Sequence, residues 1–434
     1  MRRPRRPGTL RVLTDGAGAR RATAAAVALA AWCAGCSDVD PDGSTNATPA
    51  ERPASAPPTA ARSLRDLAAL GYAQWDEGVE EEETAEDRSN EVHDPTRVEP
   101  CERAWADDRS RIHVIDVDGR PVRTIEVPGR QQVEFARFLA GGRIACVGVD
   151  EGLTLLEADG SIVWHLDVAC HHDVAAVPDG APPGERTFAL AVHHAREWQG
   201  RSVRFDDVLF IDERSGQPSA SMQPWRTFEH RDVLLDRAGL ERHPLDAPPE
   251  EPTDTTYDYF HLNSIAFDGP DAMLVCLRNV DLVVAIDLPS RTIGSGLGPG
   301  TLDWPHAPSI VERDGRRAVL VFDNGYHRGW SRAVELDRVS GEVLWEYRGT
   351  PSRPLFSRVR GYVERLPGGN TLITESERGR ALEVTDEGEI VWEHWNPEVR
   401  ETPRGFSRRR IYRMTAVDPA GDAAPAARSG TGGR

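Results

Sequence analysis

Short runs of β-branched and aromatic residues, separated by turns built on Asp or Gly, recur along most of this chain. The six turns lie at Asp116–Gly119, Ala158–Gly160, Asp212–Gly216, Asp287–Ser290, Asp337–Gly341 and Thr385–Gly388. Turns of this kind between β-rich runs are hairpin signals, and their spacing of roughly 40 to 75 residues is typical of propeller blades. The pattern predicts an all-β fold, a six-bladed β-propeller over residues 101–415.

Three of these turns are followed by nearly the same apolar strand, which ends on Trp164, Trp345 or Trp392. Because the tryptophans recur at one point of the repeat, we expect them to pack one blade against the next. Stacking on a ligand is the less economical interpretation.

Three histidines also share a position in the repeat. His171, His261 and His306 each stand eight or nine residues before a glycine that begins a strand. In a propeller the innermost strand of each blade lines the axis, so equivalent residues near its start point to one place. A single histidine is usually structural, but three in one register predict a central site.

The N-terminus has the features of a targeting segment. A basic stretch is followed by uncharged residues from Ala22 to Trp32 and then by Cys33-Ala34-Gly35-Cys36, which resembles a bacterial lipobox. We therefore expect residues 1–36 to be a lipoprotein signal peptide, with Cys36 as the acylated residue. An ordinary secretory signal cut nearby is the alternative. Either way, we expect an exported protein, and acylation would attach it to the bacterial envelope.

Residues 37–100 are rich in Pro and Ala and then in acidic residues, and residues 416–434 are equally poor in apolar side chains. Both segments are expected to be disordered, the first as a linker that holds the propeller away from a membrane. The Pro-rich stretch from Glu229 to Tyr259 is expected to form a long loop over the channel mouth. The net charge of -18, with 70 acidic and 52 basic residues, excludes a nucleic-acid partner, since phosphates bind clustered cations.

Several segments of the propeller region recur in one known family. They are Phe260–Ile265, Leu277–Asp281, His306, Phe322–Gly325, Ser331-Arg332 and Arg365–Leu372. In order and spacing, from about His171 to Trp395, they resemble the bacterial arylsulfotransferases that take a sulfuryl group from aryl sulfates instead of a nucleotide. The resemblance implies a six-bladed propeller with a central histidine site and a covalent sulfohistidine.

Residue by residue, the resemblance implies that His306 is the nucleophile and that Arg278 binds the sulfuryl group, with His261 and Asn263 as the family's His-x-Asn pair. The remaining histidine is His171 or the substrate-binding His172, and the blade register favours His171. Imidazole can attack sulfur directly, a nearby acid such as His171 can protonate the departing phenoxide, and fixed donors can hold the sulfuryl oxygens. Aryl sulfates and phenols are the implied substrates, and no cofactor, nucleotide or metal is required.

Two other functions fit parts of the pattern. His171, His261 and His306 with Cys170 or Cys276 would suit zinc or copper. A propeller lipoprotein without enzymatic activity, acting as a scaffold, would explain the repeated tryptophans, since fold does not imply function. It would not explain three histidines in register with Arg278 and Asn263.

Overall fold

The computed structural model describes residues 89–417, apart from residues 108, 131, 183–186, 199–200, 225–256, 259, 299, 351–352 and 403–404. The predicted signal peptide, the linker up to residue 88, most of the predicted loop and the tail from residue 418 lie outside the described residues. No helix among the described residues is long and apolar enough to cross a membrane.

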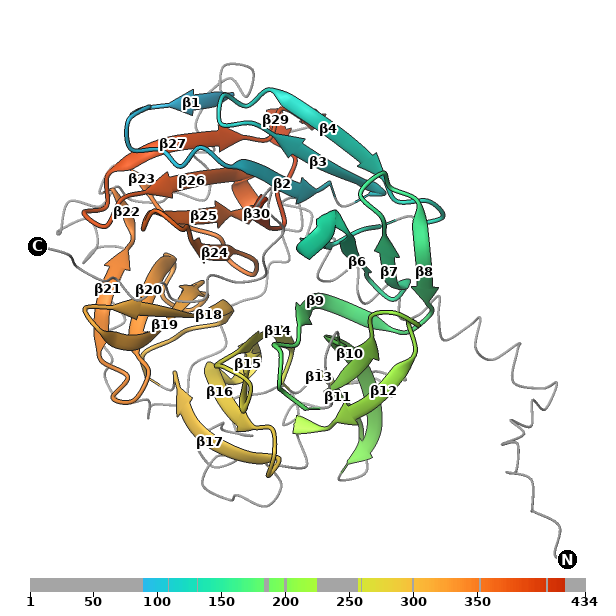
Figure 1. Cartoon of the computed structure of the whole chain (residues 1–434). Helices are drawn as coiled ribbons and strands as arrows, with labels where there is room; N and C mark the ends of the chain where they lie inside the picture. Colours follow the sequence, from blue (N-terminus) through green and yellow to red (C-terminus); the bar gives the residue numbers. More distant parts are fainter. Residues whose placement is uncertain are drawn as a thin grey trace, which may run out of the picture. The chain divides into compact units, whose positions relative to one another are not determined.

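Six antiparallel sheets are arranged as blades around a ring, which confirms the predicted all-β propeller (Figure 1). From the axis outward, the strands are β30 (Met414–Val417), β2 (Glu102–Ala106), β3 (Arg111–Ile115) and β4 (Pro121–Glu126) in blade 1; β5 (Phe135–Phe138), β6 (Ile144–Gly148), β7 (Gly152–Leu156) and β8 (Ile162–Leu166) in blade 2; β9 (Cys170–Ala176), β10 (Thr187–Trp198), β11 (Arg201–Asp212) and β12 (Pro218–Met222) in blade 3; β14 (Leu262–Phe267), β15 (Ala272–Leu277), β16 (Leu282–Asp287) and β17 (Thr292–Leu297) in blade 4; β18 (Pro305–Arg313), β19 (Arg316–Asp323), β20 (Arg332–Asp337) and β21 (Val343–Tyr347) in blade 5; and β24 (Tyr362–Arg365), β25 (Thr371–Glu375), β26 (Arg380–Val384) and β27 (Ile390–Trp395) in blade 6.

The two ends of the described chain close the ring. β30 pairs with β2, so the C-terminal strand becomes the innermost strand of blade 1. β1 (Asn90–Val92) pairs with β27 at the outer edge of blade 6, so this blade has a fifth strand from the region before residue 101. Three short additions are β13 (Tyr257–Asp258), which pairs with β11, and the hairpins of β22 (Gly349–Thr350) with β23 (Arg353–Pro354) and of β28 (Val399–Thr402) with β29 (Gly405–Arg408).

Each of the six predicted turns connects the third and fourth strands of one blade. In the first, the backbone N–H of Gly119 donates to the carbonyl of Asp116 over 2.9 Å, and in the third, Gly216 donates to Asp212 over 2.8 Å. Both glycines have a positive φ that an L-residue rarely adopts, which explains why these two turns end on Gly. The turn count therefore gave the correct number of blades.

The apolar core is divided among the interfaces between blades. Six clusters of buried residues each draw on two neighbouring blades, such as Phe188 of blade 3 with Phe135 of blade 2. Each sheet thus buries both faces against its neighbours, which removes apolar surface from water. The inner strands near the axis are free to carry polar side chains.

The repeated tryptophans pack the blades together, as predicted. The indole N–H groups of Trp164, Trp345 and Trp392 donate to the carbonyls of Glu213, Asp386 and Val117 over 2.7 to 2.8 Å. Each acceptor lies in the third-to-fourth-strand turn of the following blade. Trp392 thereby ties blade 6 to blade 1, where the ring closes.

We expect Trp392→Ala to lower the free energy of unfolding by about 3 to 5 kcal/mol, the usual cost of removing a buried aromatic side chain. Trp392 is fully buried, with the guanidinium of Arg103 stacked 4.3 Å from its ring centroid. Urea unfolding followed by circular dichroism measures the loss, with Val339→Ala in an exposed turn as the matched control. An unchanged midpoint for Trp392→Ala would contradict the role of this contact in closing the ring.

Candidate functional site

Three inner strands begin with the same irregular backbone. His172, His261 and Ala307 have φ angles of 57°, 52° and 51°, and the pairing of β9, β14 and β18 with their neighbours shifts register at this point. Non-glycine residues avoid this conformation, and such bulges often re-aim side chains beside functional sites. Each of the three stands eight residues before its strand glycine, so His172 is the structural counterpart of His261.

His172 and His261 form a direct pair. Their Nε2 atoms lie 2.8 Å apart, so one ring must donate a proton that the other accepts. On its other side, His172 Nδ1 lies 2.7 Å from the hydroxyl of Tyr412 and 3.3 Å from the carboxylate of Glu134. Burial holds the pKa of His172 below its ordinary value, so its ring is neutral at neutral pH.

His171 lies outside this hydrogen-bonded pair, although the blade register favoured it; its ring contacts the ring of His172 edge-on, with 4.9 Å between centroids. Its Nε2 atom lies 3.2 Å from Oδ1 of Asp206, and its ring stacks on that of His193 with 3.8 Å between centroids. The rings of His171 and His261 are 6.5 Å apart. The structure thus brings His172, and not His171, into contact with His261.

The tautomer of His306 is fixed by Asn324. The amide nitrogen of Asn324 donates to the carbonyls of Ser357 and Arg360 over 2.7 and 2.6 Å, which leaves its Oδ1 atom 2.6 Å from Nδ1 of His306. Because backbone carbonyls only accept hydrogen bonds, the amide cannot be flipped without losing both contacts. His306 therefore carries its proton on Nδ1 and a free lone pair on Nε2.

His306 is also held in its neutral form. Burial and the nearby charge of Arg278 put the pKa of His306 well below its ordinary value. The imidazole is 2% exposed. A buried, neutral imidazole with its lone pair on a defined nitrogen is a candidate nucleophile.

Arg278 lies between the histidine pair and the strand of His306. It begins the short 3-10 turn Arg278–Val280, and its backbone N–H donates to the carbonyl of His261 over 3.2 Å. Its guanidinium stacks 4.4 Å from the ring centroid of Trp304. The arrangement supplies a fixed cation beside the histidines.

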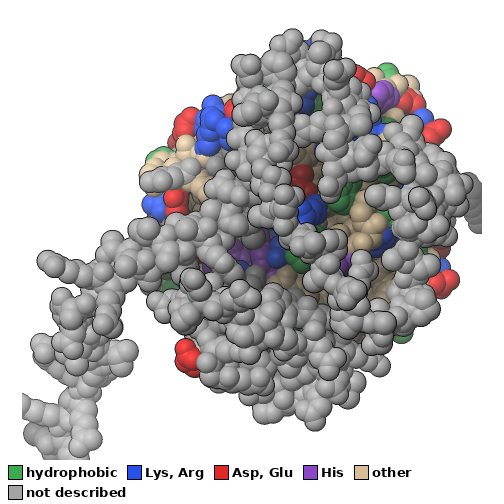
Figure 2. Space-filling model, turned by 180° about the vertical axis from the view of Figure 1, so that it is seen from behind, with side chains coloured by type: hydrophobic (Ala, Val, Ile, Leu, Met, Phe, Trp, Pro, Cys, Tyr) green, Lys and Arg blue, Asp and Glu red, His purple; other side chains and the backbone are tan. Residues whose placement is uncertain are grey.

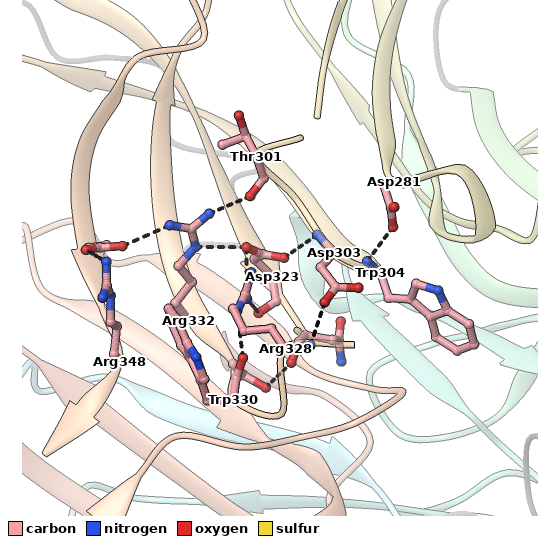
Figure 3. Close-up of polar contacts among 12 residues, drawn as sticks. Asp281, Thr301, Asp303, Trp304, Asp323, Arg328, Trp330, Arg332 and Arg348 are labelled. Carbon is pink, nitrogen blue, oxygen red and sulfur yellow. Dashed lines mark hydrogen bonds and ion pairs between the residues drawn. The ribbon is translucent and has the colours of Figure 1, made fainter. Parts of the chain in front are cut away.

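A polar network holds the turn that leads into His306 (Figure 3). Asp281 accepts the backbone N–H of Trp304 over 2.8 Å, and Asp323 accepts that of Asp303 over 2.7 Å. Arg332 donates to the second oxygen of Asp323 over 2.8 Å. Blades 4 and 5 together therefore fix Trp304, which has a positive φ of 58°, and with it the residues just before His306.

Asn263 is used to join two inner strands. The side-chain amide nitrogen of Asn263 donates to the carbonyl of Pro305 over 2.8 Å. The backbone carbonyl of Asn263 accepts a 2.8 Å hydrogen bond from the guanidinium of the buried Arg413. Its Oδ1 atom has no hydrogen-bond partner among the described residues. Asn263 thus positions β14 against β18, at the strand that carries His306.

The predicted residues gather at the centre of the ring. The face in Figure 2 is hollowed near its middle, and histidine and arginine side chains collect there. Four further residues of the site were not predicted: Glu134, Asn324, Tyr412 and Arg413. Cys36 lies outside the described residues.

The predicted metal set does not come together. The thiols of Cys170 and Cys276 donate to the carbonyls of Gly148 and Pro305, over 3.4 and 3.1 Å. Within the described part of the chain, the groups that could hold an ion are His171 with His193 and Asp206, and Asp107 with His113 and Glu398.

Fold and site together define a β-propeller with a buried centre of histidine and arginine. Residues 240–397 match the family model described as Arylsulfotransferase (ASST). This match and the six-bladed fold fit the arylsulfotransferase family. The matched segment contains His261, Asn263, Arg278 and His306, whereas His171 and His172 lie before it.

Solved structures with similar folds are distant in sequence. A protein of unknown function from Bacteroides caccae is 15% identical, with a TM-score of 0.45 over 68% of this chain and 94% of that one. BamB from Moraxella catarrhalis is 11% identical, with a TM-score of 0.35 over 68% of this chain and 73% of its own. No curated protein matches the chain.

Proposed function

We propose that this protein transfers a sulfuryl group from an aryl sulfate to a phenol through a sulfohistidine on His306. The observation that carries the proposal is the state of His306, a neutral imidazole whose Nε2 lone pair is fixed by Asn324 beside the cation of Arg278. The family match over residues 240–397 supports the reaction class.

In the first half-reaction, Nε2 of His306 attacks the sulfur and the bond from sulfur to the aryl oxygen breaks. The electron pair of that bond leaves with the phenoxide. As charge develops on the sulfuryl oxygens, the guanidinium of Arg278 provides fixed N–H donors, which is worth about 10²- to 10³-fold for one such donor. His261 is next to this cation, because its backbone carbonyl accepts the N–H of Arg278. Asn263 acts through the backbone of β18, where it donates to the carbonyl of Pro305.

In the second half-reaction, a phenol gives its proton to the His172–His261 pair and its oxygen attacks sulfur. The bond from sulfur to Nε2 breaks, His306 regains its lone pair, and the histidine pair releases the proton to solvent. Because the lowered pKa of His172 leaves its ring unprotonated at neutral pH, the pair can take the role of the base but has no extra proton to give as an acid. Aryl sulfates with acidic phenols should therefore be the better donors, and His171 is no longer needed as the acid. Neither half-reaction requires a nucleotide or a metal ion.

A pH profile of the donor half-reaction tests this proposal. Release of 4-nitrophenol from its sulfate ester in a single turnover should have an acid limb well below pH 6.5, because His306 stays unprotonated until its lowered pKa is reached. Stopped-flow absorbance measures the release, with and without phenol as the acceptor. No release from any of several aryl sulfates, or a limb centred at or above pH 6.5, would contradict the proposed nucleophile.

A further inference from the structure

A buried carboxylate contacts the histidine pair from blade 2. Glu134 stands directly before β5 and is 8% exposed. Both of its oxygens contact His172: Oε2 accepts the backbone N–H over 2.9 Å, and Oε1 lies 3.3 Å from Nδ1 of the imidazole. A single side chain thus holds the backbone of His172 and places a carboxylate beside its ring.

This carboxylate fixes the tautomer of His172. Burial alone would raise the pKa of Glu134, but the charge and the N–H groups of His172 outweigh burial and hold the pKa below its ordinary value. An ionised carboxylate only accepts hydrogen bonds, so a lone pair on Nδ1 of His172 would face its negative charge. The proton therefore lies on Nδ1, and Nε2 of His172 accepts the N–H that Nε2 of His261 donates over 2.8 Å.

Glu134 is also the anion of its surroundings. In the described part of the chain, the other titratable groups that act on the ring of His172 are His171, His261, His306, Tyr412 and Arg413. None of these carries a negative charge at neutral pH, because burial raises the pKa of Tyr412 and the rest are imidazoles or a guanidinium. A positive charge on His172 is therefore stabilised by Glu134.

We propose that Glu134 is the positioning residue of a proton relay, in which it orients His172 and balances the positive charge that this ring acquires. The inference rests on the sulfuryl transfer proposed above. In the acceptor half-reaction, the O–H bond of the phenol breaks and its proton bonds to His261, whose Nε2 proton moves to Nε2 of His172. The electron pair of the O–H bond forms the new bond to sulfur, and that of the bond from sulfur to nitrogen returns to His306.

The cost of burying Glu134 favours this direction of transfer. An ionised carboxylate is costly to bury beside a neutral ring, and the cost falls when the ring becomes an imidazolium. The fixed charge thus stabilises the state that forms as the phenol loses its proton, which is the state that a general base has to reach. Glu134 acts through His172 and makes no contact with the sulfuryl group in this scheme.

Separate measurement of the two half-reactions tests the relay. Glu134→Gln keeps the shape of the side chain and removes its charge, so transfer from the sulfohistidine to phenol should slow by about 10²-fold, the lower end of what a general base contributes. Release of 4-nitrophenol from its sulfate ester should keep its wild-type rate, because nitrophenoxide leaves without a proton.

The matched control is Glu157→Gln, which removes a carboxylate of the same blade whose side chain is 44% exposed and pairs with Arg143. It should change neither half-reaction. If the acceptor half-reaction were as fast in Glu134→Gln as in this control, the relay would be wrong. A wild type that releases no 4-nitrophenol would instead contradict the proposed sulfuryl transfer.

Tyr412→Phe separates the carboxylate from the hydroxyl that lies 2.7 Å from the same Nδ1 atom. This variant should slow the acceptor half-reaction by at most about tenfold, the value of one neutral hydrogen bond. A larger loss in Tyr412→Phe than in Glu134→Gln would assign the role to the tyrosine and overturn the proposal.

NMR of the wild type labelled with ¹⁵N-histidine tests the tautomer without any substrate. The signals of His172, assigned by their loss in His172→Gln, should show a proton on Nδ1 and a lone pair on Nε2. A proton on Nε2 instead would overturn the role of Glu134, even in a protein that transfers sulfuryl groups. This measurement needs neither catalysis nor a folded Glu134→Gln variant, so the two proposals fail separately.

Discussion

His306→Ala should lower the rate of sulfuryl transfer by at least about 10⁴-fold, because removal of a covalent nucleophile eliminates the step that divides the reaction in two. The 4-nitrophenyl sulfate and phenol assay measures this directly. The variant should fold normally, since the rest of the blade interface is unchanged and, among the described residues, the side chain of His306 makes hydrogen bonds only through Nδ1, to Asn324 Oδ1 and the carbonyl of Trp304.

The matched control is His194→Ala, which removes a histidine whose side chain is 44% exposed, outside the proposed site. It should retain wild-type activity. If His306→Ala were as active as this control, another group would have to attack the sulfur. A propeller that served only as a scaffold would show no sulfuryl transfer in any variant, and its binding function would tolerate the loss of His306.

Arg278→Ala should slow the donor half-reaction by about 10²- to 10³-fold, the typical effect of losing one preorganised donor to developing negative charge. Arg278→Lys should restore only part of the rate, because an ammonium lacks the planar guanidinium that stacks on Trp304. Loss of the arginine should also raise the pKa of His306, whose cation it disfavours. The acid limb of the pH profile should therefore move upward in Arg278→Ala.

Arg316→Ala is the control for this substitution, since Arg316 is half exposed and begins β19, at the end of the strand away from the partner of His306. It should change neither the rate nor the pH profile. An Arg278→Ala enzyme with a wild-type rate and an unshifted acid limb of the pH profile would show that the guanidinium neither binds the sulfuryl group nor lowers the pKa of His306.

The fold was predictable because its signals are local. Each blade contains a turn between its third and fourth strands, and turn chemistry depends on a few adjacent residues such as Asp116 and Gly119. The tryptophans recur for a similar reason, since Trp164, Trp345 and Trp392 make the same contact with the next blade. Ring closure by β30 and β1 was not predicted, because neither strand carries the repeat.

The site was predictable only where it follows the repeat. His261 and His306 were identified from blade register, and the structure places both near Arg278. The distinction between His171 and His172 required the eight-residue spacing that His172 and His261 share, which marks the left-handed residue of each inner strand. His171 and His306 both stand nine residues before their strand glycines, and aligning these two histidines with each other hid the eight-residue spacing.

The remaining site residues reach the centre through long-range contacts. Tyr412 and Arg413 precede the strand that closes the ring, and Glu134 precedes the inner strand of blade 2. Asn324 lay within a segment of the family resemblance, but its role depends on the carbonyls of Ser357 and Arg360 in the next connection. Pairing of distant segments leaves no periodic pattern in the sequence, so only the structure reveals it.

Mass spectrometry of the protein after brief exposure to an aryl sulfate, without any acceptor, tests the central claim most directly. A covalent sulfohistidine adds SO₃, about 80 Da, to the peptide that contains His306, as covalent catalysis requires. The adduct should disappear when phenol is added and should not form in His306→Ala. Release of phenol with no adduct on this peptide, or with the adduct on another residue, would contradict the account.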